Sequence, residues 1–370
     1  MLGLAAVTAG DTAALAQAEP PAVTAVDLGG PPGTSSPVAA LVNDHGLVAG
    51  WGQVGPYEIR GFLWRDGVLT ELPGSSRPQA VSNSGHVVGS EVHRFGTQAF
   101  RWVDGVHTPL GYLGGTDTAG GYSSSAADVN DAGEVVGSST TDSGEQHAVR
   151  WRDGVMTDLG TLGGGYSAAT AINRRGQIAG VSATADEAWH AFLWSDGVMT
   201  DLGTLGGAFA VPSDINDAGQ VVGVSTTADD VTHAFLWRDG RMTDLQAHDP
   251  DGFGTAVAIN RWGQVLVDSS SGLDFVWDNG WYAFLGGLGG DPTETLPRSL
   301  NDAGEVVGVS TLADGSRHAF RWIPGAMTDL GTLGGEGSGA WDVNAAGMVV
   351  GSADTPSDGA HAVFWRITDG

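Results

Sequence analysis

The stretch HAVRWRDGVMTDLGTLGG, residues 147–164, recurs along the whole chain. Close copies follow it as HAFLWSDGVMTDLGTLGG from His190, HAFLWRDGRMTDL from His233 and HAFRWIPGAMTDLGTLGG from His318. A shortened copy, HAVFWRITDG, ends the sequence. Self-similarity at a fixed period of this length is typical of propellers and solenoids. We therefore expect the repeat to determine the architecture.

Two sequence markers count the repeats. The first marker is the tryptophan of the HAFLW-like segment, which occurs at Trp64, Trp102, Trp151, Trp194, Trp237, Trp277, Trp322 and Trp365. The second is an N-x-x-G segment, with serine in place of asparagine in the second unit, which begins at Asn43, Ser82, Asn130, Asn173, Asn216, Asn260, Asn301 and Asn344. Both markers give eight units, most often spaced by about 43 residues.

Within one unit the residue pattern predicts four short strands, at 168–172, 177–182, 190–194 and 198–202 in a well-preserved copy. Short segments rich in valine, isoleucine and aromatic residues, separated by turn residues, are typical of antiparallel strands. The N-x-x-G and Asp-Gly segments between them supply the residues that tight turns require. Each unit is therefore expected to form one four-stranded antiparallel blade.

The two ends of the repeat array favour a ring over an open solenoid. The last unit stops at residues 365–370, where its fourth strand is due, and residues 22–30 match the missing segment. A first strand that completes the last blade leaves no free edge, whereas an open solenoid needs polar caps. We predict an all-β fold, a closed eight-bladed β-propeller formed by residues 19–370 as a single domain. A β-solenoid is the alternative.

Residues 1–18 are rich in alanine and end in Ala16-Gln17-Ala18, which fits a signal-peptidase site. No basic segment precedes them, so we expect either a signal peptide or a low-complexity leader. The signal-peptide interpretation places the protein outside the cell or at the cell surface.

Composition excludes several classes of function. The chain carries 43 acidic residues against 16 basic ones, all of them arginine, and its net charge is −27. Such a charge repels phosphate backbones, so nucleic-acid binding is not expected. The lack of cysteine excludes disulfides, thiol nucleophiles and thiolate metal sites. No apolar run is long enough to span a membrane.

The combination of His-Ala-Phe, Leu-Trp, Asp-Gly and DLGTLGG resembles the HAF repeat of bacterial extracellular proteins. The resemblance covers essentially residues 22–370. It implies a secreted or cell-surface repeat protein and brings no catalytic residues with it. The chain departs from the pattern in the first, second and sixth units, where Arg60, Gln98 and Leu273 replace the histidine.

The repeated histidine and tryptophan are expected to be structural. Equivalent positions on different blades lie far apart around a ring, so the histidines cannot converge on one metal ion. We predict that each repeated histidine is hydrogen-bonded near the end of its blade, and we predict no metal site. The tryptophans recur in every unit, so we predict that they pack between blades, each burying about 150–250 Å².

Five tryptophans break the repeat. Strand order places the N-x-x-G and Asp-Gly turns at one end of the sheets, the turn rim. The second-to-third-strand loops and the connections between units emerge at the opposite end, the variable rim, where binding residues are expected because these loops differ. Trp51 and Trp189 map to the variable rim and are candidate ligand-binding residues. Trp262 and Trp281 map to the turn rim, and Trp341 maps to a first strand.

Acidic loops on the variable rim supply further candidates. Their oxygen ligands suit Ca²⁺, but none has the spacing of an EF-hand loop, so we expect solvated carboxylates and no cofactor. His248 and Asp249 form a histidine–carboxylate pair in the sixth connection. His248, Asp249 and Asp251 therefore join the candidate ligand-binding residues.

Three functional hypotheses are compatible with the sequence. We favour a secreted, monomeric, non-enzymatic scaffold that binds a protein or carbohydrate partner on the variable rim. The first alternative is a carbohydrate-active hydrolase or lyase with acidic residues near the central channel, for which no catalytic residue stands out. The second alternative is a purely structural surface protein.

Overall fold

The computed structural model describes residues 22–56, 58–93, 96–114, 121, 123–249 and 252–368. Within these residues the chain forms 32 β-strands and one short 3-10 helix, η1 (Pro292–Glu294). The expectation of an all-β fold is therefore confirmed for the described part of the chain. The predicted leader, residues 1–18, lies outside the described residues.

The strands form eight four-stranded units, numbered here in chain order. Units 1 and 2 comprise β2 (Ser35–Val42), β3 (Val48–Gln53), β4 (Ile59–Arg65), β5 (Val68–Glu71), β6 (Ser75–Val81), β7 (Val87–His93), β8 (Gly96–Val103) and β9 (Val106–Pro109). Units 3 and 4 comprise β10 (Ser124–Val129), β11 (Val135–Thr140), β12 (Gln146–Arg152), β13 (Val155–Asp158), β14 (Gly163–Ile172), β15 (Ile178–Thr184), β16 (Trp189–Ser195) and β17 (Val198–Gly203).

The second half of the chain repeats this plan. Units 5 and 6 comprise β18 (Gly206–Ile215), β19 (Val221–Thr227), β20 (Thr232–Arg238), β21 (Arg241–Asp244), β22 (Gly254–Ile259), β23 (Val265–Ser269), β24 (Phe275–Asp278) and β25 (Trp281–Phe284). Units 7 and 8 comprise β26 (Leu296–Leu300), β27 (Val306–Thr311), β28 (Arg317–Ile323), β29 (Ala326–Asp329), β30 (Ser338–Val343), β31 (Val349–Asp354), β32 (Ala360–Thr368) and β1 (Ala22–Gly29).

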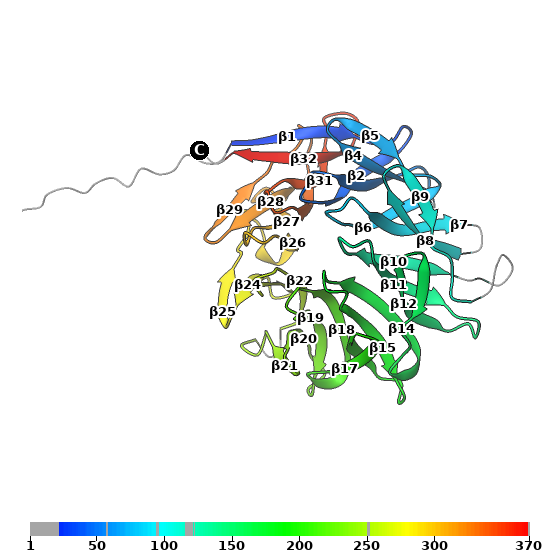
Figure 1. The fold of residues 1–370 in the computed structure, drawn as a ribbon. Coiled ribbons are helices and arrows are strands. Elements are labelled where there is room, and N and C mark those ends of the chain that lie inside the picture. Colours follow the sequence, from blue (N-terminus) through cyan, green and yellow to red (C-terminus); the bar gives the residue numbers. More distant parts are fainter. Residues whose placement is uncertain are drawn as a thin grey trace, which may run out of the picture.

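In every unit the strands pair antiparallel, and in units 1 to 7 they do so in chain order. The first strand of each unit lies toward the centre and the fourth strand at the periphery (Figure 1). Single parallel contacts, Gln146 with Tyr166 and Trp189 with Phe209, join units 3, 4 and 5 into one 12-stranded sheet. Among the described strands, no sheet closes on itself through its own hydrogen bonds.

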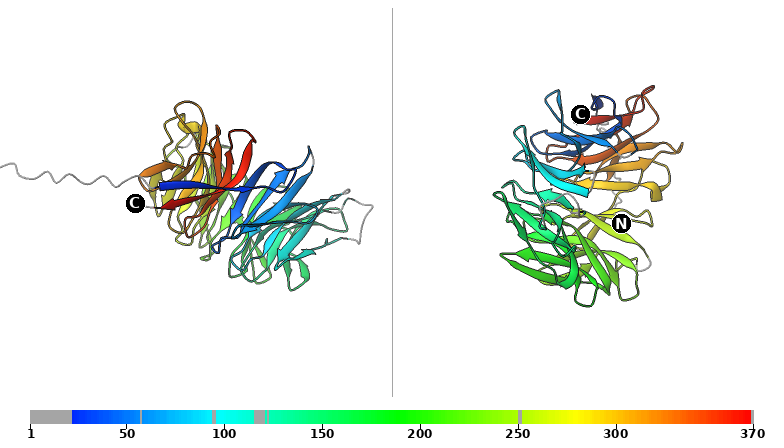
Figure 2. Two further views of the ribbon diagram at one scale, coloured as in Figure 1. Left: turned by 90° about the horizontal axis from the view of Figure 1, so that it is seen from above. Right: turned by 90° about the vertical axis from the view of Figure 1, so that its right-hand side faces the viewer.

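The two ends of the array meet in unit 8. Strand β1 pairs antiparallel with β32, from Ala22 opposite Thr368 to Gly29 opposite Ala362, and so supplies the fourth strand of this unit. The predicted exchange of the first strand is therefore confirmed. Unit 1 also touches unit 8, because the backbone N–H of Val42 donates to Oδ2 of Asp342 at 2.9 Å. Figure 2 shows the sheets side by side in a disc.

The first strand of unit 4 is longer than the sequence pattern predicts. We expected it at 168–172, but β14 begins at Gly163, which pairs with Thr184. The glycine pair allows this extension because a side chain at Gly164 would lie 2.6 Å from the carbonyl oxygen of Thr184. The segment that leads to the next unit thus becomes part of its innermost strand.

The hairpin turns have the backbone geometry that their residues predict. Asp196 and Gly197 both have positive φ angles, 53° and 87°, as a two-residue type I′ turn requires. Gly176, at the end of one N-x-x-G segment, has φ of 75°, a conformation that other residues adopt only at a cost.

The hydrophobic core lies between neighbouring units. Phe192 and Trp194 of unit 4 pack with Val136, Ala148 and Leu159 of unit 3, and all five side chains are buried. The interpretation of the repeated tryptophan as packing between units is therefore confirmed at Trp194.

Asparagine side chains link the units at the turn rim. In seven of the eight units the buried Asn of N-x-x-G donates from Nδ2 to the backbone carbonyl of the equivalent residue in the next unit. The last of these bonds runs from Asn344 back to the carbonyl of Asn43, at 3.0 Å. The same Asn also accepts from its own turn, as Oδ1 of Asn173 does from the N–H groups of Arg175 and Gln177. These repeated turns are therefore structural, as their similarity from unit to unit predicts.

Candidate functional site

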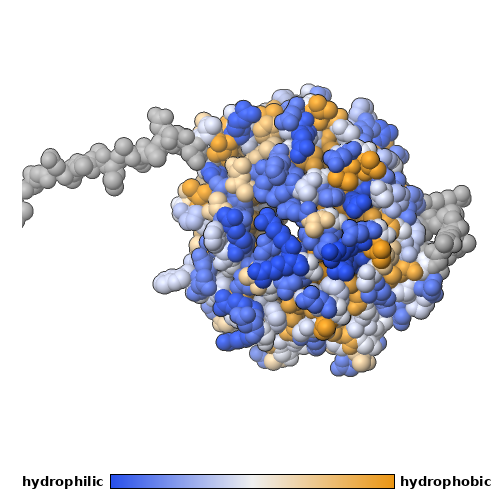
Figure 3. All heavy atoms as spheres, viewed as in Figure 1, coloured by the Kyte–Doolittle hydropathy of each residue, from blue (hydrophilic) through white to orange (hydrophobic). Residues whose placement is uncertain are grey.

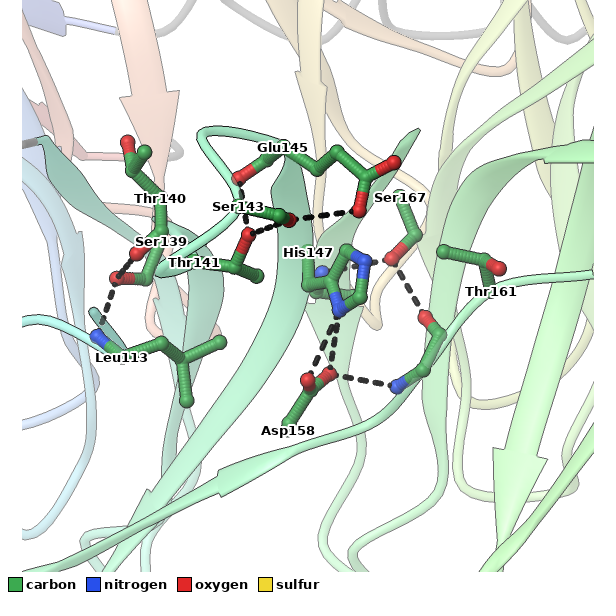
Figure 4. Close-up of polar contacts among 12 residues, drawn as sticks. Leu113, Ser139, Thr140, Thr141, Ser143, Glu145, His147, Asp158, Thr161 and Ser167 are labelled. Carbon is green, nitrogen blue, oxygen red and sulfur yellow. Dashed lines mark hydrogen bonds and ion pairs between the residues drawn. The ribbon is translucent and has the colours of Figure 1, made fainter. Parts of the chain in front are cut away.

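The repeated histidines pair with the aspartate of the TDL segment in their own unit. Figure 4 shows His147, whose Nδ1 lies 2.9 Å from Oδ2 of Asp158, while Asp158 also accepts from the N–H of Gly160. The same pair occurs at His190–Asp201, His233–Asp244, His318–Asp329 and His361–Asp27. The predicted structural role is confirmed, and the pair in unit 8 joins β32 to β1.

A hollow of about 360 Å³ lies at the centre of the turn rim and is bordered by the N-x-x-G segments of all eight units. The space-filling view shows a central hollow surrounded by hydrophilic residues (Figure 3). The polar groups around the hollow form hydrogen bonds between neighbouring turns. The N–H of Arg174 donates to Asp217, and that of Arg261 donates to Asp302. These contacts give the hollow a structural role.

Three carboxylates on innermost strands also join neighbouring units. Asp128, Asp214 and Asp342 accept hydrogen bonds from the N–H groups of Ile172, Ile259 and Val42 in the next unit. Burial raises the pKa of Asp128 to about 6, and it raises the pKa of Asp214 and Asp342 as well. Their bonds across the unit boundaries make them part of the packing.

Both tryptophans predicted for binding lie toward the variable rim. Trp189 is 43% exposed and stacks on Tyr166, with ring centroids 4.7 Å apart. Trp51 is half-buried in the inner strand β3, and the guanidinium of Arg77 lies over its ring at 4.8 Å. Trp189 therefore presents an open aromatic surface, whereas Trp51 is part of an arginine–tryptophan stack between units 1 and 2.

The structure brings His248 into an aromatic cluster. Its ring centroid lies 4.6 Å from Tyr282 and 5.7 Å from Phe275. Among the described hydrogen bonds, Asp249 contributes only backbone groups, to Gln246 and Gly252. Asp251 lies outside the described residues. The described geometry thus places His248 against aromatic rings and shows no bond between its ring and Asp249.

A pocket that the sequence reasoning missed lies on the variable-rim side between units 7 and 8. It encloses about 310 Å³ and is bordered by Arg298, Arg317, Trp341 and Asp354. The guanidinium carbon of Arg298 lies 4.0 Å from the centroid of the Trp341 ring. An arginine and an indole in such contact attract each other, so the stack fixes one wall of the pocket.

Two carboxylates of unit 6 approach this region. Asp274 is 2% exposed, accepts a hydrogen bond from the N–H of Ser269 at 2.8 Å, and has a second oxygen without a partner among the described residues. Burial and the neighbouring Asp268 raise the pKa of Asp274 to about 7, against the lowering effect of the Ser269 bond. Burial also raises the pKa of Asp268, while the positive charge of Arg298 lowers it.

Alignment of the units against one another would have revealed these residues. The position three residues before the N-x-x-G segment carries small or medium side chains in six units, but arginine and tryptophan in units 7 and 8, namely Ala40, Gln79, Ala127, Thr170, Ser213, Val257, Arg298 and Trp341. Similarly, Asp274 of unit 6 stands at the position that the fully buried Ala191 occupies in the His-Ala-Phe segment of unit 4. The sequence pattern marked Trp341 as a departure from the repeat but gave no sign of its contact with Arg298.

No protein-family model and no characterised protein sequence matches the chain. Among solved structures, the β-propeller domain of the Trilobed protease from Pyrococcus furiosus aligns with a TM-score of 0.54 and 11% identity, over 80% of this chain and 96% of that one. A puromycin-hydrolyzing peptidase from Mycobacterium tuberculosis aligns with a TM-score of 0.50 and 14% identity, over 86% of this chain and 57% of that one. The chain therefore has a β-propeller fold, and at these identities the likeness concerns the fold alone.

No helix among the described residues is long and apolar enough to cross a membrane. The described histidines and carboxylates form no group of three or more that could hold a metal ion.

Proposed function

We propose that the chain is a secreted, closed eight-bladed β-propeller of the HAF-repeat type that binds a protein or carbohydrate partner and has no enzymatic activity of its own. The ring closure is supported by the pairing of β1 with β32 and by the hydrogen bond from Asn344 to Asn43. In contrast, the Pyrococcus furiosus domain is described as having an open velcro topology.

The observation that carries the binding function is the distribution of side chains on the inner strands. Units 7, 8, 1 and 2 bear two arginine–tryptophan stacks, Arg298 with Trp341 and Arg77 with Trp51. The equivalent inner positions of units 3 to 5 carry uncharged residues of small or medium size, such as Ala127. Aromatic and arginine side chains dominate binding hot spots, so we assign the binding surface to this arc of the variable-rim side.

Binding can be tested with the full chain on a glycan array and against extracellular proteins. We expect ligand binding that weakens in Trp341→Ala and in Trp51→Ala. Trp262→Ala is the matched control because Trp262 also lies under an arginine, Arg261 at 4.7 Å, but on the turn rim. Equal effects of all three substitutions would contradict a binding surface on the variable-rim side.

The carboxylate pair of unit 6 favours a second candidate function, a carbohydrate-active hydrolase or lyase. Asp274, with a pKa of about 7, and the more exposed Asp268 lie side by side. Two neighbouring carboxyl groups in different environments, one of which keeps its proton up to about pH 7, are an arrangement that general acid–base catalysis uses. Turnover of a polysaccharide by the intact chain, abolished in Asp268→Asn, would establish this function in place of simple binding.

A further inference from the structure

The pocket between units 7 and 8 has a lining that selects one class of ligand. Its charged groups are the guanidinium groups of Arg298 and Arg317 and the carboxylate of Asp354. The whole chain has 16 arginines and a net charge of −27. Neither Arg298 nor Arg317 forms an ion pair with a described carboxylate, and the two guanidinium groups outnumber the single carboxylate of the lining.

Arg298 is held in position without a full set of partners. Its guanidinium lies over Trp341, and its Nε is buried without a hydrogen-bond acceptor among the described residues. Burial and the charge of Arg317 lower the pKa of Arg298, whereas Asp268 raises it. Asp268 is the carboxylate whose charge reaches Arg298. A ligand carboxylate would add hydrogen-bond acceptors, which planar guanidinium groups bind in a bidentate manner.

We propose that this pocket binds a uronic acid residue of an acidic glycan. The inference rests on the proposed binding function and names its ligand. Arg298 and Arg317 hold the sugar carboxylate, and the indole of Trp341 offers an apolar surface to the C–H face of the ring. Asp354 accepts hydrogen bonds from the ring hydroxyls. The four side chains thus match the acid, the apolar face and the hydroxyl groups of one sugar unit.

The size of the pocket agrees with a single sugar unit or two. Its volume of about 310 Å³ is at the lower end of ligand pockets, which span ~300–1,000 Å³. The glycines of the wall keep it open: a methyl group added at Gly337 would lie 3.2 Å from Oδ2 of Asp354, and one at Gly339 would lie 3.0 Å from the Val309 side chain.

Other small ligands suit the lining less well. A neutral sugar would offer the two guanidinium groups no carboxylate to bind in a bidentate manner. Inorganic phosphate would satisfy the arginines but would gain nothing from the indole of Trp341. The combination of arginine, carboxylate and indole therefore points to an anion that also carries hydroxyl groups.

The test is calorimetric titration of the full chain with tetragalacturonate. We expect binding to the acid, none to its methyl ester at the same concentration, and no displacement by equimolar inorganic phosphate. Arg298→Gln and Trp341→Ala should each weaken binding roughly tenfold to a hundredfold, the effect of losing a charge-assisted contact. Arg261→Gln, which breaks the arginine–tryptophan stack on the turn rim, should leave the affinity unchanged.

The outcomes separate this inference from the proposed function. Binding of the ester with equal affinity, displacement by phosphate, or an unchanged affinity in Arg298→Gln would overturn the uronate assignment. Arg298→Lys is the second variant: it keeps the charge and, if folded, should recover part of the affinity. A neutral glycan or protein bound through Trp341 or Trp51 would refute the uronate but support the proposed function. If no ligand responds to any variable-rim substitution, both are wrong.

Discussion

Units 4 and 6 share one backbone plan but differ in the character of their side chains, most clearly at four equivalent positions. Unit 4 has the full HAF pattern, with Val181 on the second strand, His190 paired to Asp201, and a fully buried Ala191. Its hairpins and its buried tryptophan repeat in its neighbours, and parallel contacts join it to units 3 and 5. Unit 4 is therefore built for packing against its neighbouring units.

At each of these positions unit 6 has a residue of opposite polarity. Asp268 stands at the valine position, Leu273 and Phe284 replace the histidine and aspartate, and Asp274 replaces the alanine. Leu273 and Phe284 are both 50% exposed, whereas Asp274 is 2% exposed. Unit 6 thus exposes apolar groups and buries a carboxyl group, the reverse of what stability favours.

The comparison shows that the repeat maintains the scaffold and that departures from it mark the regions free to acquire function. The regular units keep their polar side chains paired across strands. The departures in units 6, 7 and 8 bring together Asp268, Arg298 and Trp341. Substitutions in units 4 and 6 test this contrast.

Trp194→Ala should have the largest effect on stability. The side chain is 7% exposed and packs on Val136, Ala148 and Leu159 of the preceding unit. Large aromatic residues replaced by alanine in a core typically cost ~3–5 kcal/mol. Denaturant unfolding should show this loss, whereas Trp189→Ala, at an exposed tryptophan of the same unit, should cost far less. Similar losses in both variants would refute the packing role.

Asp274→Ala, which introduces the residue of the other units, should stabilise the protein at pH 8. Because folding raises the pKa of Asp274 from 3.8 to about 7, the folded state binds more protons than the unfolded state between these values. The stability from this group is therefore present below about pH 4 and is lost as the pH rises through 7.

The pH dependence provides the measurement. We expect Asp274→Ala to gain ~1–3 kcal/mol over the native protein at pH 8, since one pKa unit corresponds to about 1.4 kcal/mol. At pH 5 the gain should shrink, because the native carboxyl is then protonated and keeps its bond to Ser269. Asp201→Ala is the control, since it removes a paired carboxylate and should destabilise at pH 8. A gain for Asp274→Ala that does not change with pH would contradict the raised pKa.

The double substitution Leu273→His and Phe284→Asp should have the smallest effect. It restores the His–Asp pair of unit 4 at a site where both side chains are half exposed. Because exposed ion pairs contribute ~0–1 kcal/mol, we expect a change in thermal stability within that range. Loss of exposed apolar area should also reduce the binding of a hydrophobic dye. Unchanged dye binding would show that Leu273 and Phe284 do not form an open apolar surface.

The sequence alone predicted much of the fold because the repeat specifies local structure. The Asp-Gly and N-x-x-G segments encode turns with positive φ, as at Asp196, Gly197 and Gly176. The match between residues 22–30 and the missing end of unit 8 predicted the pairing of β1 with β32, because a strand edge must find a partner. The extra length of β14 was missed because glycine-rich segments carry no strand signal.

The candidate site could be predicted only in part. The variable rim was assigned from strand order, and Trp51 and Trp189 lie there. Arg298, Trp341 and Asp268 come from three units and are far apart along the chain, so no local motif connects them. Only the packing of inner strands brings Arg298 over Trp341 and places Asp268 beside Asp274.

The sequence by itself thus determined the four-stranded unit, the number of repeats, the strand exchanged between the ends and the acidic character of the protein. These properties follow from residue periodicity, turn chemistry and charge, which are local. The tertiary structure decided which departures from the repeat share a pocket and which carboxyl group is buried. Neighbours in space, desolvation and unpaired charge depend on how distant units pack, and no single repeat encodes them.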